Sequence, residues 1–214
     1  MEFGFLSILL FGLILGFKHA LEPDHVIAVS TIASRSKNLW NSSLSGVFWG
    51  IGHTFTLFVF GLIVIGLKQE ISDPVAMSLE FIVGIVLVYL GISNVFVKER
   101  QTHSHHKNGA TSYWKSTLLG LVHGLAGSAA MVLLTMSTVH TIWEGAIYII
   151  IFGIGTCVGM LLFTTVLGVP FVFSNKGVTV NALFIKITGI ISILFGIYYM
   201  YNIGINDGLF KIWI

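Results

Sequence analysis

Charged residues are scarce in this chain of 214 residues. Aspartate, glutamate, lysine and arginine make up 9% of it, whereas hydrophobic residues make up 55%. An ordinary soluble domain has roughly 25% charged residues, so the composition excludes a soluble domain and indicates an integral membrane protein. The net charge of +2, with no basic stripe interleaved with aromatic residues, also excludes nucleic acid as an expected partner. The lipid bilayer is the expected surrounding.

Cysteine and proline are scarce as well. Cys157 is the only cysteine, which excludes an intramolecular disulfide and a dithiol electron-transfer role. One of the three prolines, Pro23, lies in an apolar stretch, where its missing N–H predicts a kink or an unwound turn. No basic region precedes that stretch, so we expect it to stay in the mature protein rather than to be cleaved as a signal peptide.

Long apolar stretches are what the chain does have. A helix needs about 20 apolar residues to cross a bilayer, and six stretches meet that length. We therefore expect an all-α integral membrane protein with six transmembrane helices in a single transmembrane domain, residues 1–214. The expected spans cover residues 3–33, broken at Glu22 and Pro23, and residues 43–66, 75–97, 116–138, 142–169 and 181–203.

The two halves of the chain resemble each other at offsets of 103 to 105 residues. Each half has three expected spans, and an odd number gives the second half the opposite membrane polarity. Inverted repeats of this kind are typical of secondary transporters, with the substrate site near the membrane midplane. The matches are HAL at 19–21 with HGL at 123–125, GIG at 50–52 with GIG at 153–155, and GIVLVYLGI at 84–92 with GIISILFGI at 189–197.

These matches divide the chain into repeat one, about 3–97, a histidine-containing loop, 98–115, and repeat two, about 116–203. Basic residues in short loops favour the cytoplasm, and most of them follow the first, third and fifth spans. We therefore expect those loops inside a bacterial-type cytoplasmic membrane and both termini outside. The basic residues on the inner side are Arg35, Lys37, Lys98, Arg100, Lys107, Lys115 and Lys176, against Lys68 and Lys211 on the outer side.

The stretch KHALEPDH, 18–25, places ionisable residues inside the first apolar span. Pro23 should deprive the carbonyl of His19 of its helical partner, and an unwound turn would let His19, Asp24 and His25 converge. Two imidazoles and a carboxylate suit a divalent first-row metal ion. A proton relay and a polar network that only ties helices together are alternatives, but ionisable groups inside spans usually mark a pathway.

Two neighbouring patterns extend this cluster. In WGIGHTFTLF, His53 lies among small residues that allow close helix approach, so it could reach the cluster as a ligand, with Thr54 orienting its ring. Lys18 and Glu22 are oppositely charged and four residues apart, which favours a pair along one helix face over metal ligation.

The second repeat keeps only part of the cluster. His123 is the repeat equivalent of His19, whereas Ser128 replaces Asp24. His123 could be a fourth ligand, a gate or a packed hydrogen-bonding histidine, and Ser128 lies on the same possible pathway. Cys157 falls near the repeat position of His53 and is a further pathway candidate, although a small membrane cysteine is more often inert.

The expected inner loop carries three more histidines. KERQTHSHHKNG contains His103, His105 and His106. A short histidine tract can bind metal, so this loop could receive or sense the ion. It could equally be a solvated linker whose basic residues enforce topology.

The motifs resemble those of the nickel/cobalt transporter family. KHALEPDHV is similar to its H-x4-D-H signature, and GIGHTFTL resembles its next motif, G-H-S-[ST]-V-V. The similarity is greatest to the short six-span branch that includes urease-accessory and high-affinity nickel transport proteins. The family's third motif, around D-T-A-T-E, reads HGLAGSAAM here, and its fourth, G-M-x-L-x-D-T, reads GMLLFTT without the aspartate.

The resemblance implies uptake of Ni²⁺ or Co²⁺ as transported substrate through His19, Asp24, His25 and His53, with no permanent cofactor and no catalysis. An exporter would use the same ligands in the same fold. A membrane-embedded metal-dependent enzyme would use Asp24 or Glu22 as a base beside metal-activated water, and a structural subunit would not need the cluster. Oligomeric state, coupling ion and any metallochaperone partner are not predicted by the sequence.

Overall fold

The computed structural model describes residues 2–36, 38–67, 71–96, 109–126, 139, 141–174 and 178–213. All regular elements within these ranges are helices. In chain order they are α1 (Glu2–His19), α2 (Pro23–Ala33), α3 (Leu39–Leu67), α4 (Asp73–Val95), α5 (Gly109–Ala126), α7 (Ile142–Ser174), α8 (Val178–Tyr201), the short π-helix η2 (Asn202–Asn206) and α9 (Leu209–Trp213).

Most of the expected spans are present as long apolar helices. α1 and α2 form a bent pair, which is either one broken span or a re-entrant loop. α5 does not meet the same criterion of length and apolar composition, and residues 127–138 of the expected fourth span lie outside the described residues. The protein is therefore an all-helical, multi-pass membrane protein, while the full set of six spans stays a prediction. The helices that are each long and apolar enough to cross a membrane are Leu39–Leu67, Asp73–Val95, Ile142–Val172 and Ala182–Asn206.

The break in the first span lies where the proline predicts it. The chain bends by 56° between α1 and α2. Pro23 occupies the first turn of α2, where a missing N–H costs nothing. The carbonyl of His19 loses its helical partner, as expected, because Pro23 has no N–H to donate. The backbone N–H of Glu22 donates to it instead, at 3.0 Å, because the chain tightens into a turn before α2 begins.

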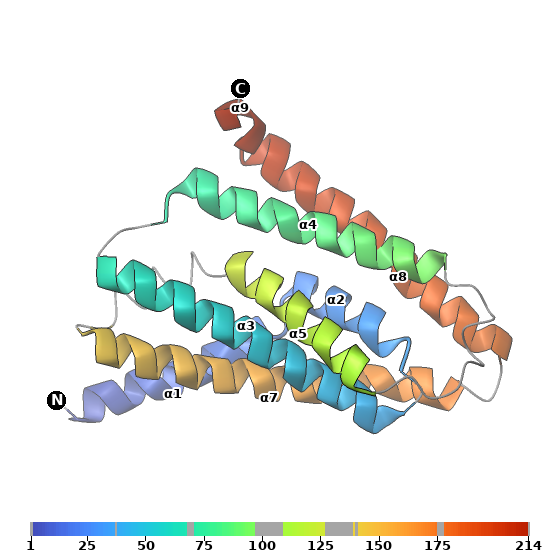
Figure 1. The fold of residues 1–214 in the computed structure, drawn as a ribbon, viewed down its shortest axis with the longest axis horizontal. Helices are drawn as coiled ribbons and strands as arrows, with labels where there is room; N and C mark the ends of the chain where they lie inside the picture. The colour runs from blue at the N-terminus through green and yellow to red at the C-terminus, as the bar shows by residue number, and fades with distance from the viewer. Residues whose placement is uncertain are drawn as a thin grey trace.

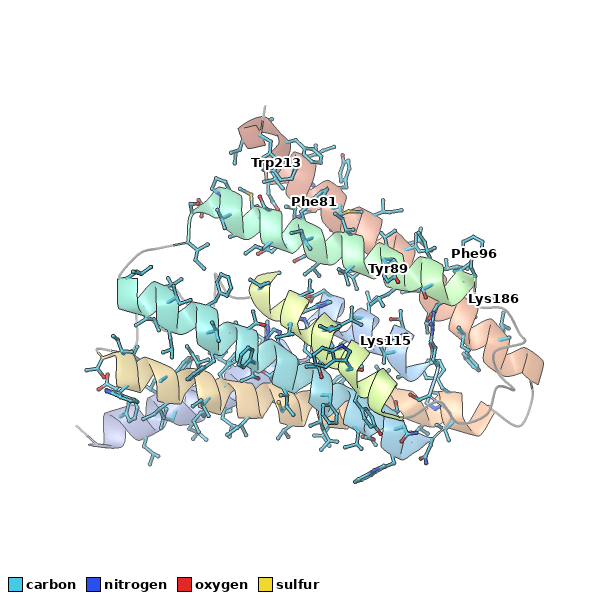
Figure 2. The ribbon with its side chains drawn as sticks, in the orientation of Figure 1. Phe81, Tyr89, Phe96, Lys115, Lys186 and Trp213 are labelled. Atoms are coloured by element: carbon cyan, nitrogen blue, oxygen red, sulfur yellow. The ribbon has the colours of Figure 1, made fainter. Side chains whose placement is uncertain are left out.

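The helices are arranged in two groups. α1, α3, α5 and α7 lie together, α4 and α8 form a pair, and α2 lies between the two groups (Figure 1). The outer surface of these helices is aliphatic and aromatic, as a lipid-facing surface requires. Trp143, for example, is 80% exposed at the start of α7. Near the start of α4, Phe81 packs its ring 6.1 Å from that of Trp213 in α9 (Figure 2).

Glycines bring the helix backbones into contact. A Cβ at Gly16 of α1 would lie 2.0 Å from the carbonyl oxygen of Phe152 in α7. A Cβ at Gly120 of α5 would lie 2.0 Å from the carbonyl oxygen of Trp49 in α3. Small residues at such crossings allow the van der Waals packing that holds helices together in lipid. These two crossings fix α1 and α3, which carry the histidines, against their neighbours.

α2 and α4 run side by side in the same direction. Ala28 packs against Val83 and Leu87 in a buried apolar cluster. Further along both helices, the side-chain amide of the buried Asn94 donates to the carbonyl oxygen of Thr31 at 3.1 Å. The interface is thus apolar at its middle and hydrogen-bonded at its C-terminal end.

Candidate metal centre

The helix break brings two histidines of the first span together. The rings of His19, at the end of α1, and His25, in the first turn of α2, have centroids 4.5 Å apart. His53 of α3 completes the group, because its Nε2 lies 3.2 Å from Nε2 of His19. All three side chains are buried, and they offer ligand atoms that lie within 4.8 Å of one another.

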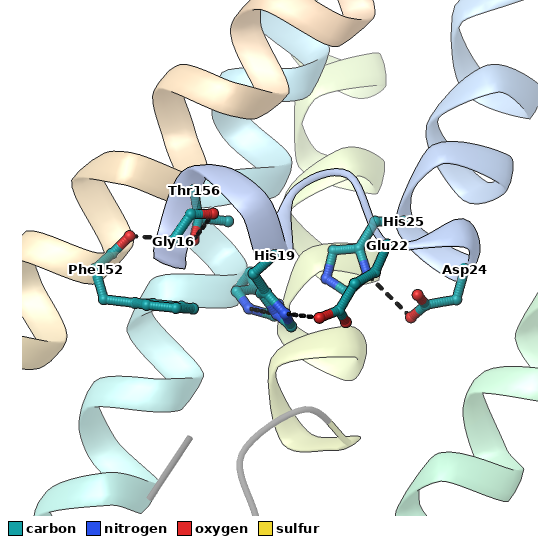
Figure 3. Close-up of polar contacts among 8 residues, drawn as sticks. Gly16, His19, Glu22, Asp24, His25, Phe152 and Thr156 are labelled. Atoms are coloured by element: carbon teal, nitrogen blue, oxygen red, sulfur yellow. Dashed lines mark hydrogen bonds and ion pairs between the residues drawn. The ribbon is translucent and has the colours of Figure 1, made fainter. Parts of the chain in front are cut away.

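Two carboxylates hold the two histidines of the first span (Figure 3). Glu22 Oε1 lies 2.9 Å from Nδ1 of His19, and Asp24 Oδ2 lies 2.9 Å from Nδ1 of His25. A carboxylate on one ring nitrogen fixes the ring orientation and leaves the other nitrogen for a metal ion. The side chain of Glu22 is 52% exposed and that of Asp24 is 16% exposed, so the carboxylates lie on the more accessible side.

This arrangement differs from one expectation. Glu22 pairs with His19, and Lys18 forms no ion pair with it among the described residues. Asp24 contacts the three imidazoles through His25, and with Glu22 and His25 it forms a second group whose ligand atoms also lie within 4.8 Å of one another.

Buried nitrogens in the group lack partners. Within the part of the chain that the structure describes, His25 Nε2 and His53 Nδ1 are buried without a hydrogen bond. Buried polar atoms are usually paired, so such nitrogens mark a place where a further group can bind.

The spacing of the nitrogens suits a metal ion. Two imidazole nitrogens bound at about 2.1 Å to one ion are about 3.0 Å apart at a right angle and about 3.4 Å apart at the tetrahedral angle. The observed 3.2 Å between Nε2 of His19 and Nε2 of His53 lies between these values. Neutral imidazoles suit Zn, Cu, Fe and Ni, whereas Mg and Ca prefer oxygen ligands.

Trp49 and His123 form the wall behind the histidines. The Trp49 ring stacks on His53 at 5.1 Å and 11° and lies 4.7 Å from the ring of His25. His123 of α5 bonds through Nδ1 to the carbonyl oxygen of Leu119 at 3.0 Å, and its ring lies 5.7 Å from that of His25. Its Nε2 is buried without a partner among the described residues, so the roles of ligand, gate and packed histidine all stay open.

The other candidate residues lie apart from the three imidazoles or outside the described ranges. Thr54 donates to the carbonyl oxygen of Gly50 at 2.8 Å, and the half-buried Cys157 of α7 packs against Gly50 of α3, where an added Cβ would lie 2.9 Å from its sulfur. These contacts indicate helix packing. Ser128, His103, His105 and His106 lie outside the described residues.

Two residues near the site were missed from the sequence. Trp49 precedes His53 by one helical turn, a spacing that places both on one face of α3. Glu80 is an ionisable residue inside the apolar span 75–97, which is itself a signal for a functional residue.

Relatives of known name place the chain in a family. The urease accessory protein UreH of Bacillus sp. (strain TB-90) is 56% identical over 221 residues, which cover 98% of this chain and 97% of that protein. The chain belongs to the UreH family. A candidate nickel/cobalt efflux system of Methanocaldococcus jannaschii, MJ1092, is 32% identical over 170 residues, 76% of this UreH-family chain and 75% of that protein.

More distant similarities cover part of the UreH-family chain. The chloroplast protein FOR GROWTH AND FERTILITY 2 of Arabidopsis thaliana is 28% identical over 73% of this chain and 46% of its own length. Residues 93–198 match the family described as the cytochrome c biogenesis protein transmembrane region. No solved structure matches the chain significantly.

Proposed function

We propose that this protein is a secondary transporter that takes up Ni²⁺, Co²⁺ or both across a bacterial-type cytoplasmic membrane. The ion binds at His19, Asp24, His25 and His53. The observation that carries the proposal is the buried group of three imidazoles at a helix break, with unpartnered nitrogens and two carboxylates beside it. Ionisable side chains are energetically costly inside a membrane span, so such a group is expected to serve an ion pathway.

The relatives support the choice of ion. One is named as a urease accessory protein and another for nickel/cobalt efflux. Broken helices that place polar groups inside the bilayer are also typical of transporter binding sites.

Equivalent packing contacts support two inverted repeats. Gly16 meets Phe152 and Gly120 meets Trp49, and these pairs exchange under the offsets of 104 and 103 residues found in the sequence. A second pair of glycine contacts is related by the same offsets. A Cβ at Gly52 would lie 2.2 Å from the carbonyl oxygen of Thr117, and a Cβ at Gly155 would lie 2.2 Å from that of Leu13.

The directions of the helices agree with the same symmetry. α3 and α7 run antiparallel in Figure 1, as do α4 and α8. We infer that repeat one, 3–97, and repeat two, 116–203, have opposite membrane polarity and that both termini face outward. Relative movement of the repeats around the histidines would then expose the site to each side in turn.

The membrane potential can drive uptake. A divalent ion that moves inward across about 100 mV gains about 4.6 kcal/mol. This energy favours accumulation without ATP or a coupled ion.

Export is a second candidate, because the Methanocaldococcus relative is named as an efflux system. The two directions differ in what they do to cells. An exporter would make its host more resistant to nickel and cobalt, whereas an importer would make the host accumulate them.

The decisive experiment is accumulation of radioactive nickel in cells that lack their own nickel transporters. Wild type, His19→Ala and Lys18→Ala should be compared at equal membrane abundance, with cobalt and zinc as competitors. Lys18 is the matched control, because it is the exposed neighbour of His19. We expect uptake by wild type and Lys18→Ala, and its loss in His19→Ala. Absence of uptake by wild type, together with increased nickel resistance, would establish export instead.

A further inference from the structure

Glu80 lies on the face of α4 that points into the bundle. At 100° per residue, it shares a face with Leu87 and Asn94, which are both buried. The opposite face of α4 carries exposed residues such as Ile85 and Tyr89. The Glu80 carboxylate is therefore directed away from lipid.

The contacts of α2 with α4 place Glu80 at the level of the helix break. Val83 and Leu87 pack against Ala28 of α2. Glu80 precedes Val83 by three residues, about 4.5 Å along the helix, and Asp24 precedes Ala28 by four residues, about 6 Å. Since the two helices run in the same direction, the carboxylates of Glu80 and Asp24 lie at the same end of the interface.

The electrostatic surroundings of Glu80 are acidic. It interacts with the carboxylates of Asp207, Asp24 and Glu22, and Tyr199 of α8 lies in range of the same four carboxylates. Among the described residues, Glu80 forms no ion pair with a lysine or arginine. Carboxylates from α4, from the α1–α2 turn, from the first turn of α2 and from the chain after η2 thus act on one region, and within the described ranges no lysine or arginine forms an ion pair with them.

The geometry of Glu22, Asp24 and His25 indicates a place for a cation beside the inner histidines, because their ligand atoms lie within 4.8 Å of one another. His25 is 2% exposed, and it belongs both to the three-imidazole group and to the group with Glu22 and Asp24. One of its nitrogens, Nε2, is buried without a partner among the described residues. A cation that arrives among the carboxylates therefore lies next to a histidine of the inner group.

We propose that Glu80 and Glu22 form an approach station for divalent transition-metal ions, from which the ion passes to the three histidines. This inference rests on the proposed function. It adds a first binding step, in which the outer carboxylates hold the ion before the histidines receive it. Acidic groups in a confined, low-dielectric region raise the local concentration of cations. Glu80 should therefore affect the concentration at which transport is half-saturated more than the maximal rate.

The first test is the kinetics of nickel uptake by wild type, Glu80→Gln, Glu80→Asp and Glu144→Gln at equal membrane abundance. Glu144 is a matched control because it lies at the start of α7, outside this group, where it accepts a hydrogen bond from the Thr141 N–H that a glutamine can retain. For Glu80→Gln we expect a KM about tenfold higher, with maximal rates within about twofold. Glu80→Asp and Glu144→Gln should resemble wild type.

A second test restores the charge chemically. Cys157 is the only cysteine, so Glu80→Cys in a Cys157→Ser background offers one thiol. A negatively charged methanethiosulfonate reagent should lower the KM of this variant, a positively charged one should raise it, and Ni²⁺ should slow both labelling reactions. These labelling rates also report on the station if Glu80→Gln fails to insert or if wild type does not transport nickel.

Each outcome bears on a different claim. A Glu80→Gln variant with the wild-type KM would overturn the station. The station would also be overturned if charged reagents did not reach the thiol that Glu80→Cys introduces. If the wild-type protein showed no nickel uptake that depends on His19, the proposed function would be overturned instead.

Discussion

Alanine substitutions at two glycines of α1 should have effects of opposite sign. Gly4 has no atom within 4 Å of an added Cβ, whereas an added Cβ at Gly16 would lie 2.0 Å from the Phe152 carbonyl oxygen. Real Cβ contacts stay beyond 3.0 Å, so α1 and α7 must separate by at least about 1 Å in Gly16→Ala. Both atoms are fixed by the backbone, which prevents a rotamer change from relieving the clash.

The magnitudes follow from two terms. Alanine in place of glycine stabilises a helix by up to about 1 kcal/mol, and this gain applies to both variants. Overpacking costs about 1–3 kcal/mol and applies to Gly16→Ala alone. The free energy of unfolding should therefore be about 1–3 kcal/mol lower for Gly16→Ala than for Gly4→Ala.

Denaturant unfolding of the purified proteins in detergent, followed by circular dichroism, measures this difference. Gly16 lies one turn before His19, so its substitution should also widen the gap between His19 and His53 and weaken nickel uptake. Equal stability of the two variants would refute the close contact of α1 with α7. A stable Gly16→Ala protein with normal uptake would refute the coupling of that contact to the site.

Two further predictions concern the histidines. Nickel uptake should fall between pH 7.5 and pH 5.5, because metal binds only the deprotonated imidazole and protons therefore compete with Ni²⁺ for the same nitrogens. Uptake that is equal at both pH values, in cells with an unchanged membrane potential, would contradict this competition at the site. Replacing His103, His105 and His106 together should impair nickel uptake at low nickel concentration far less than His19→Ala does. A loss as large as that of His19→Ala would make the loop part of the transport path.

The helix break could be predicted because its cause is local. Pro23 removes a helical hydrogen-bond donor and its ring clashes with the preceding turn, and the convergence of His19 and His25 follows from the turn that lies there. The approach of His53 to His19 was predictable only in part. The glycines around His53 indicate close helix crossings, but these crossings join α3 to α5 and α7 rather than to α1. The helix break and the close crossings can each be predicted from a few consecutive residues of the sequence.

The pairing of the carboxylates could not be predicted in the same way. A helical spacing of four residues suggests Lys18 as the partner of Glu22, yet the turn after His19 directs Glu22 to His19 at 2.9 Å. The rule for helical pairs does not apply where the helix has ended. Trp49 and Glu80 were missed for another reason, because their proximity to the site depends on how α3, α4 and α2 pack.

If the protein transports an ion as proposed, the packing of α2 against α4 requires movement. At one end, carboxylates surround the approach to His25. Beyond them, Ala28 is packed against Val83 and Leu87, and further on Asn94 ties α4 to the end of α2. A divalent ion cannot cross close-packed apolar side chains without losing its ligands, so α2 and α4 must separate before an ion held by the histidines can leave on the far side. We expect the helix break to allow this movement, with α2 tilting about the turn at 20–22 while the close contact of Gly16 with Phe152 holds α1 against α7.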